Sequence, residues 1–125
     1  EAQWEYACRA GSSEQMSFDE LNKVGWYYNN SQGKTHPAAQ KNANSWGLYD
    51  THGNVAEWCL DYYSPDYPEK PVTDPNGPAQ GSYKVRRGGS FSHFRIAARC
   101  AARSSAPASY QLKDTGFRVV INIEE

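Results

Sequence analysis

The chain has 125 residues, 13 basic and 14 acidic, with a formal net charge of −1. This length suits one domain with a single core, and the absence of any basic cluster larger than Arg86-Arg87 argues against nucleic acid as a partner. No apolar run approaches the ~20 residues of a membrane-spanning helix, and residues 1–30 lack a signal-peptide pattern, so we expect a soluble domain without membrane contact, of unknown compartment.

Residues 1–10 favour a helix, because Trp4 and Cys8 are four residues apart and Gly11 stands where a helix would end. Residues 12–50 show little periodicity, and residues 65–81 are rich in turn formers. Residues 83–91 and 116–123 are the best candidates for strands, while residues 96–103 suit either a strand or a short helix. The whole chain, residues 1–125, is expected to be one domain with aromatic side chains packed under long loops.

Five motifs occur in a fixed order. They are WEYACRAG at 4–11, GLYDTHGNVAEWC at 47–59, RRGGSF at 86–91, RCAAR at 99–103 and GFRVV at 116–120. Together they resemble the C-terminal half of the formylglycine-generating-enzyme family, also called sulfatase-modifying factors. The resemblance covers nearly the whole chain and implies an α+β, loop-rich, C-type-lectin-like fold with short antiparallel strands. It also implies that the N-terminal part of the family domain is missing here.

The motif at 47–59 suits a hard cation. Asp50 and Glu57 supply two carboxylates, and Gly53 permits a tight turn that would direct backbone carbonyls inward. The resemblance implies a structural calcium ion held by Asp50, Gly53, Val55 and Glu57. The alternative is a simple hairpin turn at Gly53 with Glu57 as a solvated charge.

The positions of the cysteines determine whether the chain can carry out the reaction of the family. Formylglycine generation in the family depends on two cysteines between the RRGGSF and RCAAR motifs, which hold copper. Residues 91–99 contain no cysteine, so we expect no copper and no formylglycine formation. The resemblance instead implies a ligand groove at the emptied site. Its predicted lining residues are Ser90, Ser92, His93, Phe94 and Asp114.

The three cysteines allow at most one disulfide within the chain, and their spacing excludes a Cys-x-x-Cys site. The resemblance implies that Cys8 and Cys100 are this pair in an oxidising compartment and neighbouring thiols in a reducing one. Cys59 is expected to be a small core residue. A zinc site built from these cysteines and one histidine is a less favoured alternative. The candidate histidines are His36, His52 and His93.

Three arginines, Arg99, Arg103 and Arg118, are expected to tie strands together through their guanidinium groups. Since the missing N-terminal strands would leave a sheet edge uncovered, we also predict a homo-oligomer.

The leading functional hypothesis is a pseudoenzyme, a non-catalytic binding or accessory module for a peptide or a small ligand. The alternatives are an accessory domain of a larger oxidoreductase, such as an iron-dependent sulfoxide synthase, or an enzyme that uses His93 as base and Asp114 as orienter. Receptor-binding proteins with variable residues on this fold are disfavoured, because residues 90–115 contain Tyr110 as the only tyrosine and no asparagine.

Overall fold

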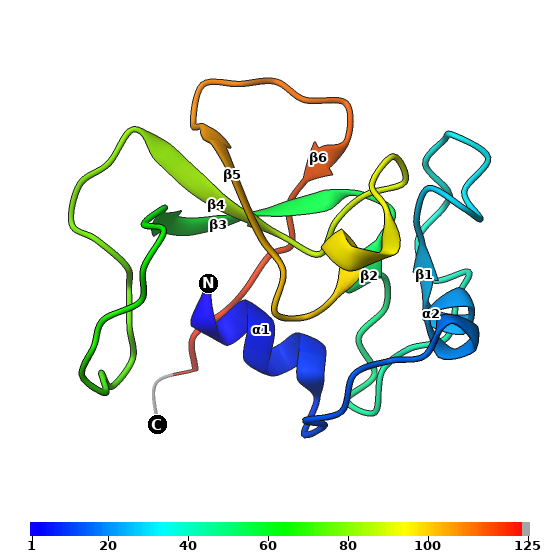
Figure 1. Ribbon diagram of the computed structural model, residues 1–125, viewed down its shortest axis with the longest axis horizontal. Coiled ribbons are helices and arrows are strands. Elements are labelled where there is room, and N and C mark those ends of the chain that lie inside the picture. Colours follow the sequence, from blue (N-terminus) through cyan, green and yellow to red (C-terminus); the bar gives the residue numbers. More distant parts are fainter. Residues whose placement is uncertain (124–125) are drawn as a thin grey trace.

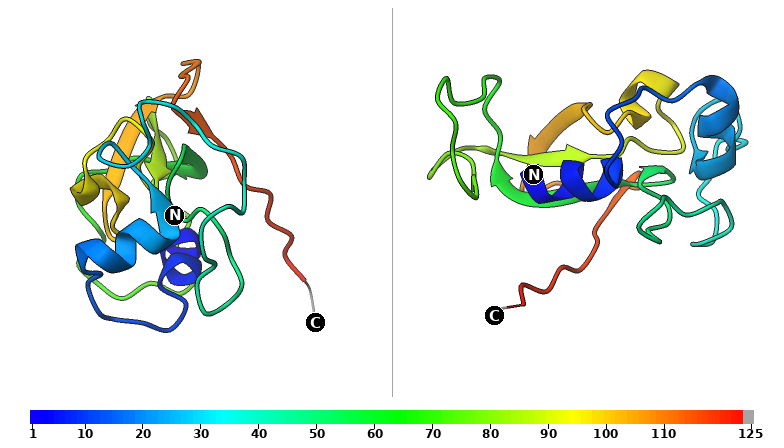
Figure 2. Two further views of the ribbon diagram at one scale, coloured as in Figure 1. Left: turned by 90° about the vertical axis from the view of Figure 1, so that its right-hand side faces the viewer. Right: turned by 90° about the horizontal axis from the view of Figure 1, so that it is seen from below.

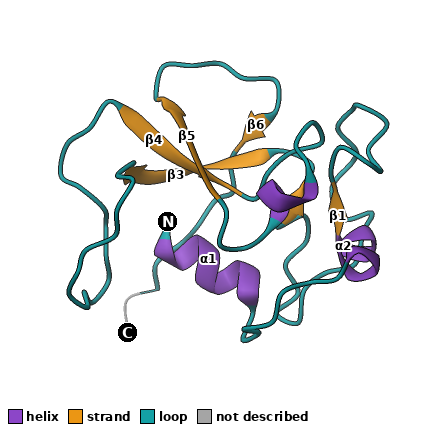
Figure 3. Cartoon of the chain, viewed as in Figure 1, coloured by secondary structure: helices purple, strands orange, loops and turns teal. Residues whose placement is uncertain are grey.

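The computed structural model describes residues 1–123 of the chain. Short helices and strands are joined by long loops, as Figures 1 and 3 show. The elements are, in chain order, α1 (Ala2–Arg9), α2 (Phe18–Val24), β1 (Gly25–Trp26), β2 (His52–Gly53), β3 (Ala56–Tyr62), β4 (Tyr83–Arg87), the 3-10 helix η1 (Arg95–Ala98), β5 (Arg103–Pro107) and β6 (Thr115–Gly116). Within residues 1–123, no helix has the length and apolar character needed to cross a bilayer.

The main sheet has four strands in the order β5-β4-β3-β6, and a second, two-stranded sheet pairs β1 with β2. The α+β class and the scarcity of regular structure are confirmed. The expectation of antiparallel strands is correct for β3 with β4 and for β4 with β5. It is wrong for β3 with β6 and for β1 with β2, which are parallel. In the main sheet the chain passes through β4, η1 and β5 before it returns beside β3, and this crossover allows the parallel pairing.

Helix α1 lies against the main sheet (Figure 1) and matches the helix predicted for residues 1–10. The helix ends at Arg9 and its C-cap is Ala10, one residue before the glycine expected there, because Ala10 adopts the left-handed conformation and its N–H donates to the carbonyl of Tyr6. Cys8 is the buried residue of this helix.

Helix α2 was not predicted, although a capping box marks its start. The Ser17 hydroxyl accepts from the backbone N–H of Glu20, and the Glu20 carboxylate accepts from the backbone N–H of Ser17. The helix has only seven residues, so its apolar pattern is too short to be recognised against the irregular segment that surrounds it.

The two predicted strands had different outcomes. Strand β4 confirms the first, although it ends at Arg87 rather than at residue 91. The strand predicted for residues 116–123 is wrong beyond Gly116, where β6 ends. Alternating apolar residues suit a strand only if a partner strand lies beside them, and residues 117–123 run away from the sheet (Figure 2). Phe117 and Ile121 are accordingly 78% and 83% exposed.

Arg87, at the end of β4, is 1% exposed and is the largest fully buried side chain among the described residues. Its Nη1 donates to the carbonyl oxygens of Cys100 and Ala102, both at 2.8 Å. Its other guanidinium nitrogens face the carboxylates of Glu1 and Glu5 beside and within α1. One side chain therefore joins α1, β4 and the segment that leads into β5.

The sequence predicted that Arg99, Arg103 and Arg118 tie segments together through their guanidinium groups. This role is confirmed for Arg103 and Arg118. Arg103 donates hydrogen bonds to the carboxylate of Glu1, and Arg118 donates bidentate hydrogen bonds to the carboxylate of Glu57. It is wrong for Arg99, which is exposed and donates only to the nearby Ile96 carbonyl in the described structure.

Replacing Arg87 by alanine is expected to lower the free energy of unfolding by about 3–5 kcal/mol, because Glu5 and two carbonyl groups would lose a buried partner. Chemical denaturation followed by circular dichroism measures the change. Arg99→Ala is the matched control and should cost less than about 0.5 kcal/mol. Equal effects of the two substitutions would contradict the role assigned to Arg87.

Candidate functional site

Cys8 and Cys100 form a disulfide in the structure, as the resemblance implied. It joins the last turn of α1 to the segment after η1, across a sequence separation of 92 residues. On the chain-entropy model, closing a loop of this size stabilises the folded state by about 4–5 kcal/mol.

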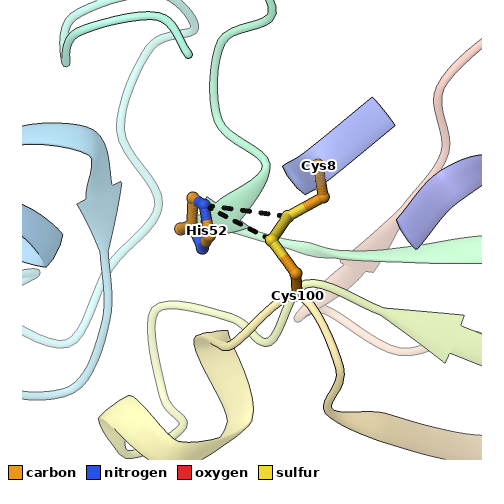
Figure 4. A group of neighbouring side chains, drawn as sticks. All are labelled: Cys8, His52 and Cys100. Carbon is orange, nitrogen blue, oxygen red and sulfur yellow. Dashed lines mark hydrogen bonds between the residues drawn. A yellow bond between two sulfur atoms is a disulfide. The ribbon is translucent and has the colours of Figure 1, made fainter. Parts of the chain in front are cut away.

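The imidazole of His52 lies directly beside this disulfide (Figure 4). Its Nε2 is 3.7 Å from the Sγ of Cys8 and 3.9 Å from the Sγ of Cys100. Its Nδ1 lies 2.7 Å from the carbonyl oxygen of Ala98. A carbonyl only accepts, so Nδ1 carries the proton and Nε2 directs its lone pair at the sulfur atoms. His52 is 3% exposed, and this burial lowers its pKa, so the ring is neutral near pH 7.

Backbone geometry brings β2 close to its neighbours at this point. Gly53 has a φ of +94°, and a Cβ built there would lie 2.0 Å from the carbonyl oxygen of Trp26. Only glycine therefore permits the β1–β2 pairing that positions His52, the preceding residue.

A hollow of about 940 Å³ opens next to the cluster. It lies between α1, α2 and η1, and among its lining residues are Cys8, His52 and Cys100. Leu21 and Val24 of α2 add apolar side chains to its wall. The buried cluster therefore borders on a space that small molecules and ions can enter.

The residues predicted to line a ligand groove lie close together. The hydroxyl oxygens of Ser90 and Ser92 are 3.1 Å apart, and Nε2 of His93 is 3.4 Å from a carboxylate oxygen of Asp114. Phe94 is exposed. Ser90 is fully buried in this structure, and its hydroxyl accepts from the backbone N–H of Ser92.

Two further residues, which the sequence did not single out, join this group. Tyr28 packs on Phe94 with ring centroids 4.8 Å apart, and its N–H donates to the His93 carbonyl. Arg86 lies 3.7 Å from Asp114, so the carboxylate faces a guanidinium group as well as the imidazole of His93. No periodic signal relates residue 28 to residue 94, so only the folded chain could show this contact.

The two carboxylates proposed to hold calcium already have protein partners. Asp50 has one carboxylate oxygen that accepts from the N–H of Ala39 and one that is buried without a partner among residues 1–123. Both oxygens of Glu57 are engaged, by Arg118 and by the indole N–H of Trp4.

The N–H of Gly53 donates to Gly88, and the side chain of Val55 packs near Gly116. A calcium ion takes six to eight oxygen ligands, and the two Glu57 oxygens already accept three hydrogen bonds from Trp4 and Arg118. Calcium binding by Asp50, Gly53, Val55 and Glu57 therefore stays a prediction.

Cys59 is free and partly buried on β3. Burial raises the pKa of its thiol to about 11, so it is protonated and unreactive near neutral pH. This agrees with the small core residue expected there.

Residues 1–123 match the family model described as a sulfatase-modifying factor enzyme 1-like domain. The chain belongs to this family.

A formylglycine-generating enzyme of Streptomyces coelicolor is 38% identical over 94% of the chain, and a Chlamydia caviae serine/threonine-protein kinase, pkn1, is 39% identical over the same share. Among solved structures, Treponema denticola variable protein 1 superposes with a TM-score of 0.87 at 36% identity, covering 93% of the chain. The chain spans 44% of the Streptomyces enzyme, 20% of the kinase and 44% of the variable protein.

Glu57→Gln is expected to destabilise the domain by about 2–4 kcal/mol, because Arg118 loses its charged partner. Thermal melts measure the loss, which should be the same in 1 mM calcium and in a chelator within the precision of the method. A loss that appears only with calcium would show that the ion, rather than Arg118, is the partner of Glu57.

Proposed function

We propose that the chain is a non-catalytic binding or accessory module of the sulfatase-modifying-factor family on a C-type-lectin-like scaffold. The observation that carries this proposal is the segment 91–99, which has no cysteine where the family resemblance places two. His93 is the only soft-metal ligand in that segment, and one imidazole does not replace two thiolates for copper(I). Oxidation of a cysteine to formylglycine is therefore not expected of this chain.

The surface around Phe94 supports a binding role. Phe94 and Tyr28 are 62% and 57% exposed and pack on each other, so they present a rigid apolar surface. Exposed aromatic rings bury much area on binding at a small cost in side-chain entropy. His93 and Asp114 stand beside them as polar groups. This arrangement suits an extended peptide or a small ligand that has an apolar group and a hydrogen-bonding group side by side.

A role within a larger protein is supported by the Chlamydia kinase, of which this domain matches only a minor part. An accessory domain of a larger oxidoreductase, for example of the sulfoxide-synthase type, is the alternative within this class. The predicted homo-oligomer stays a prediction.

An enzymatic role is the second candidate, and the contact between His93 and Asp114 favours it. A carboxylate at 3.4 Å can orient an imidazole that acts as a base. Arg86 shares the same carboxylate, however, and so weakens the hold of Asp114 on the ring. The binding role is preferred because no nucleophile with an activated side chain faces His93 among the described contacts.

Incubation with copper(I), oxygen and a cysteine-containing sulfatase peptide is expected to give no formylglycine, because the required thiol pair is absent from residues 91–99. Mass spectrometry of the peptide detects the product. The Streptomyces coelicolor relative serves as the positive control under the same conditions. Copper-dependent turnover by this chain would overturn the non-catalytic assignment.

Selection from a displayed library of extended random peptides is expected to enrich binders that need Phe94. Phe94→Ala should weaken the enriched peptides at least tenfold, about 1.4 kcal/mol, whereas Phe117→Ala, at another exposed phenylalanine, should leave them unchanged. Fluorescence anisotropy measures both. Peptides that bind the two variants equally well, or no enrichment at all, would count against this surface.

A further inference from the structure

We propose that the reduced form of this domain binds a zinc ion through Cys8, His52 and Cys100, in place of the disulfide. The three residues are far apart in sequence but are the one group of three histidine, cysteine or acidic residues within residues 1–123 whose ligand atoms lie within 4.8 Å of one another. This inference does not depend on the binding surface at Phe94.

Two of the three distances between the ligand atoms already match those of a zinc site. Zinc lies about 2.3 Å from thiolate sulfur and about 2.0–2.1 Å from imidazole nitrogen, so in a tetrahedral site nitrogen and sulfur are about 3.6 Å apart. Nε2 of His52 is 3.7 and 3.9 Å from the two sulfur atoms. Only the two sulfur atoms need to separate, to about 3.8 Å, which small rotations of the cysteine side chains can provide.

The imidazole of His52 has the surroundings of a metal ligand. Its Nδ1–H donates to the carbonyl of Ala98, which fixes the ring and leaves Nε2 as the free ligand atom. Metal-binding histidines almost always have such a partner for the second nitrogen. Figure 4 shows the Nε2 side of the ring facing both sulfur atoms.

The other two histidines are used differently, which points to His52. His36 stacks on Trp26 and its Nε2 bonds to the Ser31 carbonyl. His93 pairs with Asp114. Cys59 is not part of the group either.

Replacing the disulfide by zinc requires reduction of the disulfide followed by binding of the metal, and both steps balance. A dithiol reductant supplies two electrons and two protons to the disulfide, giving two thiols, and is itself oxidised to a disulfide. Zinc then displaces both thiol protons and is bound by two thiolates and one neutral imidazole. The resulting centre has no net charge, which limits the cost of its burial.

Access and coordination number are consistent with the hollow beside the cluster. Cys8, His52 and Cys100 all line this space of about 940 Å³, so reductant and metal can arrive through it. With three protein ligands, the fourth tetrahedral position falls to a water molecule, as in other zinc sites of this composition. Disulfide and zinc would each tie α1 to the segment after η1, in oxidising and in reducing conditions respectively.

The test uses the whole chain with Cys59→Ser as background, since Cys59 lies outside the group and would otherwise add a thiol. The protein is reduced with a dithiol, freed of reductant without air and titrated with Zn²⁺ against a chromophoric chelator. We expect one equivalent to bind to the reduced protein and none to the oxidised protein. His52→Ala should weaken binding by about 100-fold or more, and His36→Ala should have no effect.

X-ray absorption at the zinc edge gives a readout that needs no ligand variant. The expected spectrum has two sulfur atoms at about 2.3 Å and one imidazole nitrogen at about 2.0–2.1 Å. If reduction unfolds the protein, one equivalent of zinc should restore the native circular dichroism spectrum. The proposal is overturned if zinc fails to restore it, if fewer than two sulfur ligands are found, or if His52→Ala and His36→Ala bind zinc equally.

Discussion

The buried guanidinium of Arg87 is the interaction on which the rest of the structure depends. It lies between the carboxylates of α1 and the carbonyls of Cys100 and Ala102, so it fixes the helix relative to the segment that carries Cys100. Cys8 is on that same helix. Arg87 thus holds the backbone of Cys100 directly and the helix of Cys8 through the Glu5 side chain, and its charge is tolerated because these partners are in place.

This arrangement follows from a core with few aliphatic side chains. The buried hydrophobic cluster consists of Leu21, Tyr27 and Ala98, with Val24 packed against it. Polar groups such as Ser31 and Ser90 are as deeply buried as the apolar ones. Hydrogen bonds and the disulfide must therefore specify the fold, because a small apolar core leaves little free energy to do so.

Local signals predicted the elements that depend on local interactions. The helix at 1–10 follows from the spacing of Trp4 and Cys8, and the family motifs led to the α+β class and to the residues around His93. Helix α2 also had a local signal in Ser17 and Glu20, but it was too short to be noticed.

The predictions that failed, and the contacts that were missed, concern residues that lie far apart in the sequence. Alternation at 117–123 suggested a strand, yet no neighbouring strand lies beside those residues. The role of Arg87 depends on α1 and on residues 100–102, and the pairing of Tyr28 with Phe94 joins two distant loops. Sequence spacing carries no information on such contacts. The contacts of Glu57 with Trp4 and Arg118 show the same limit, since these residues lie 53 and 61 positions away in the sequence.

The segment 91–99 connects the two sites proposed for the domain. Where the family resemblance places a reactive thiol pair, this chain has the short helix η1, and the Ala98 carbonyl at its end orients His52 toward the sulfur atoms. On its other side the same segment presents His93 and Phe94. The segment packs closely on the loop that precedes it, because a Cβ at Gly89 would lie 2.8 Å from the Ala97 carbonyl oxygen. A segment without cysteines thus carries the proposed binding surface on one side and positions the histidine beside the Cys8–Cys100 pair on the other.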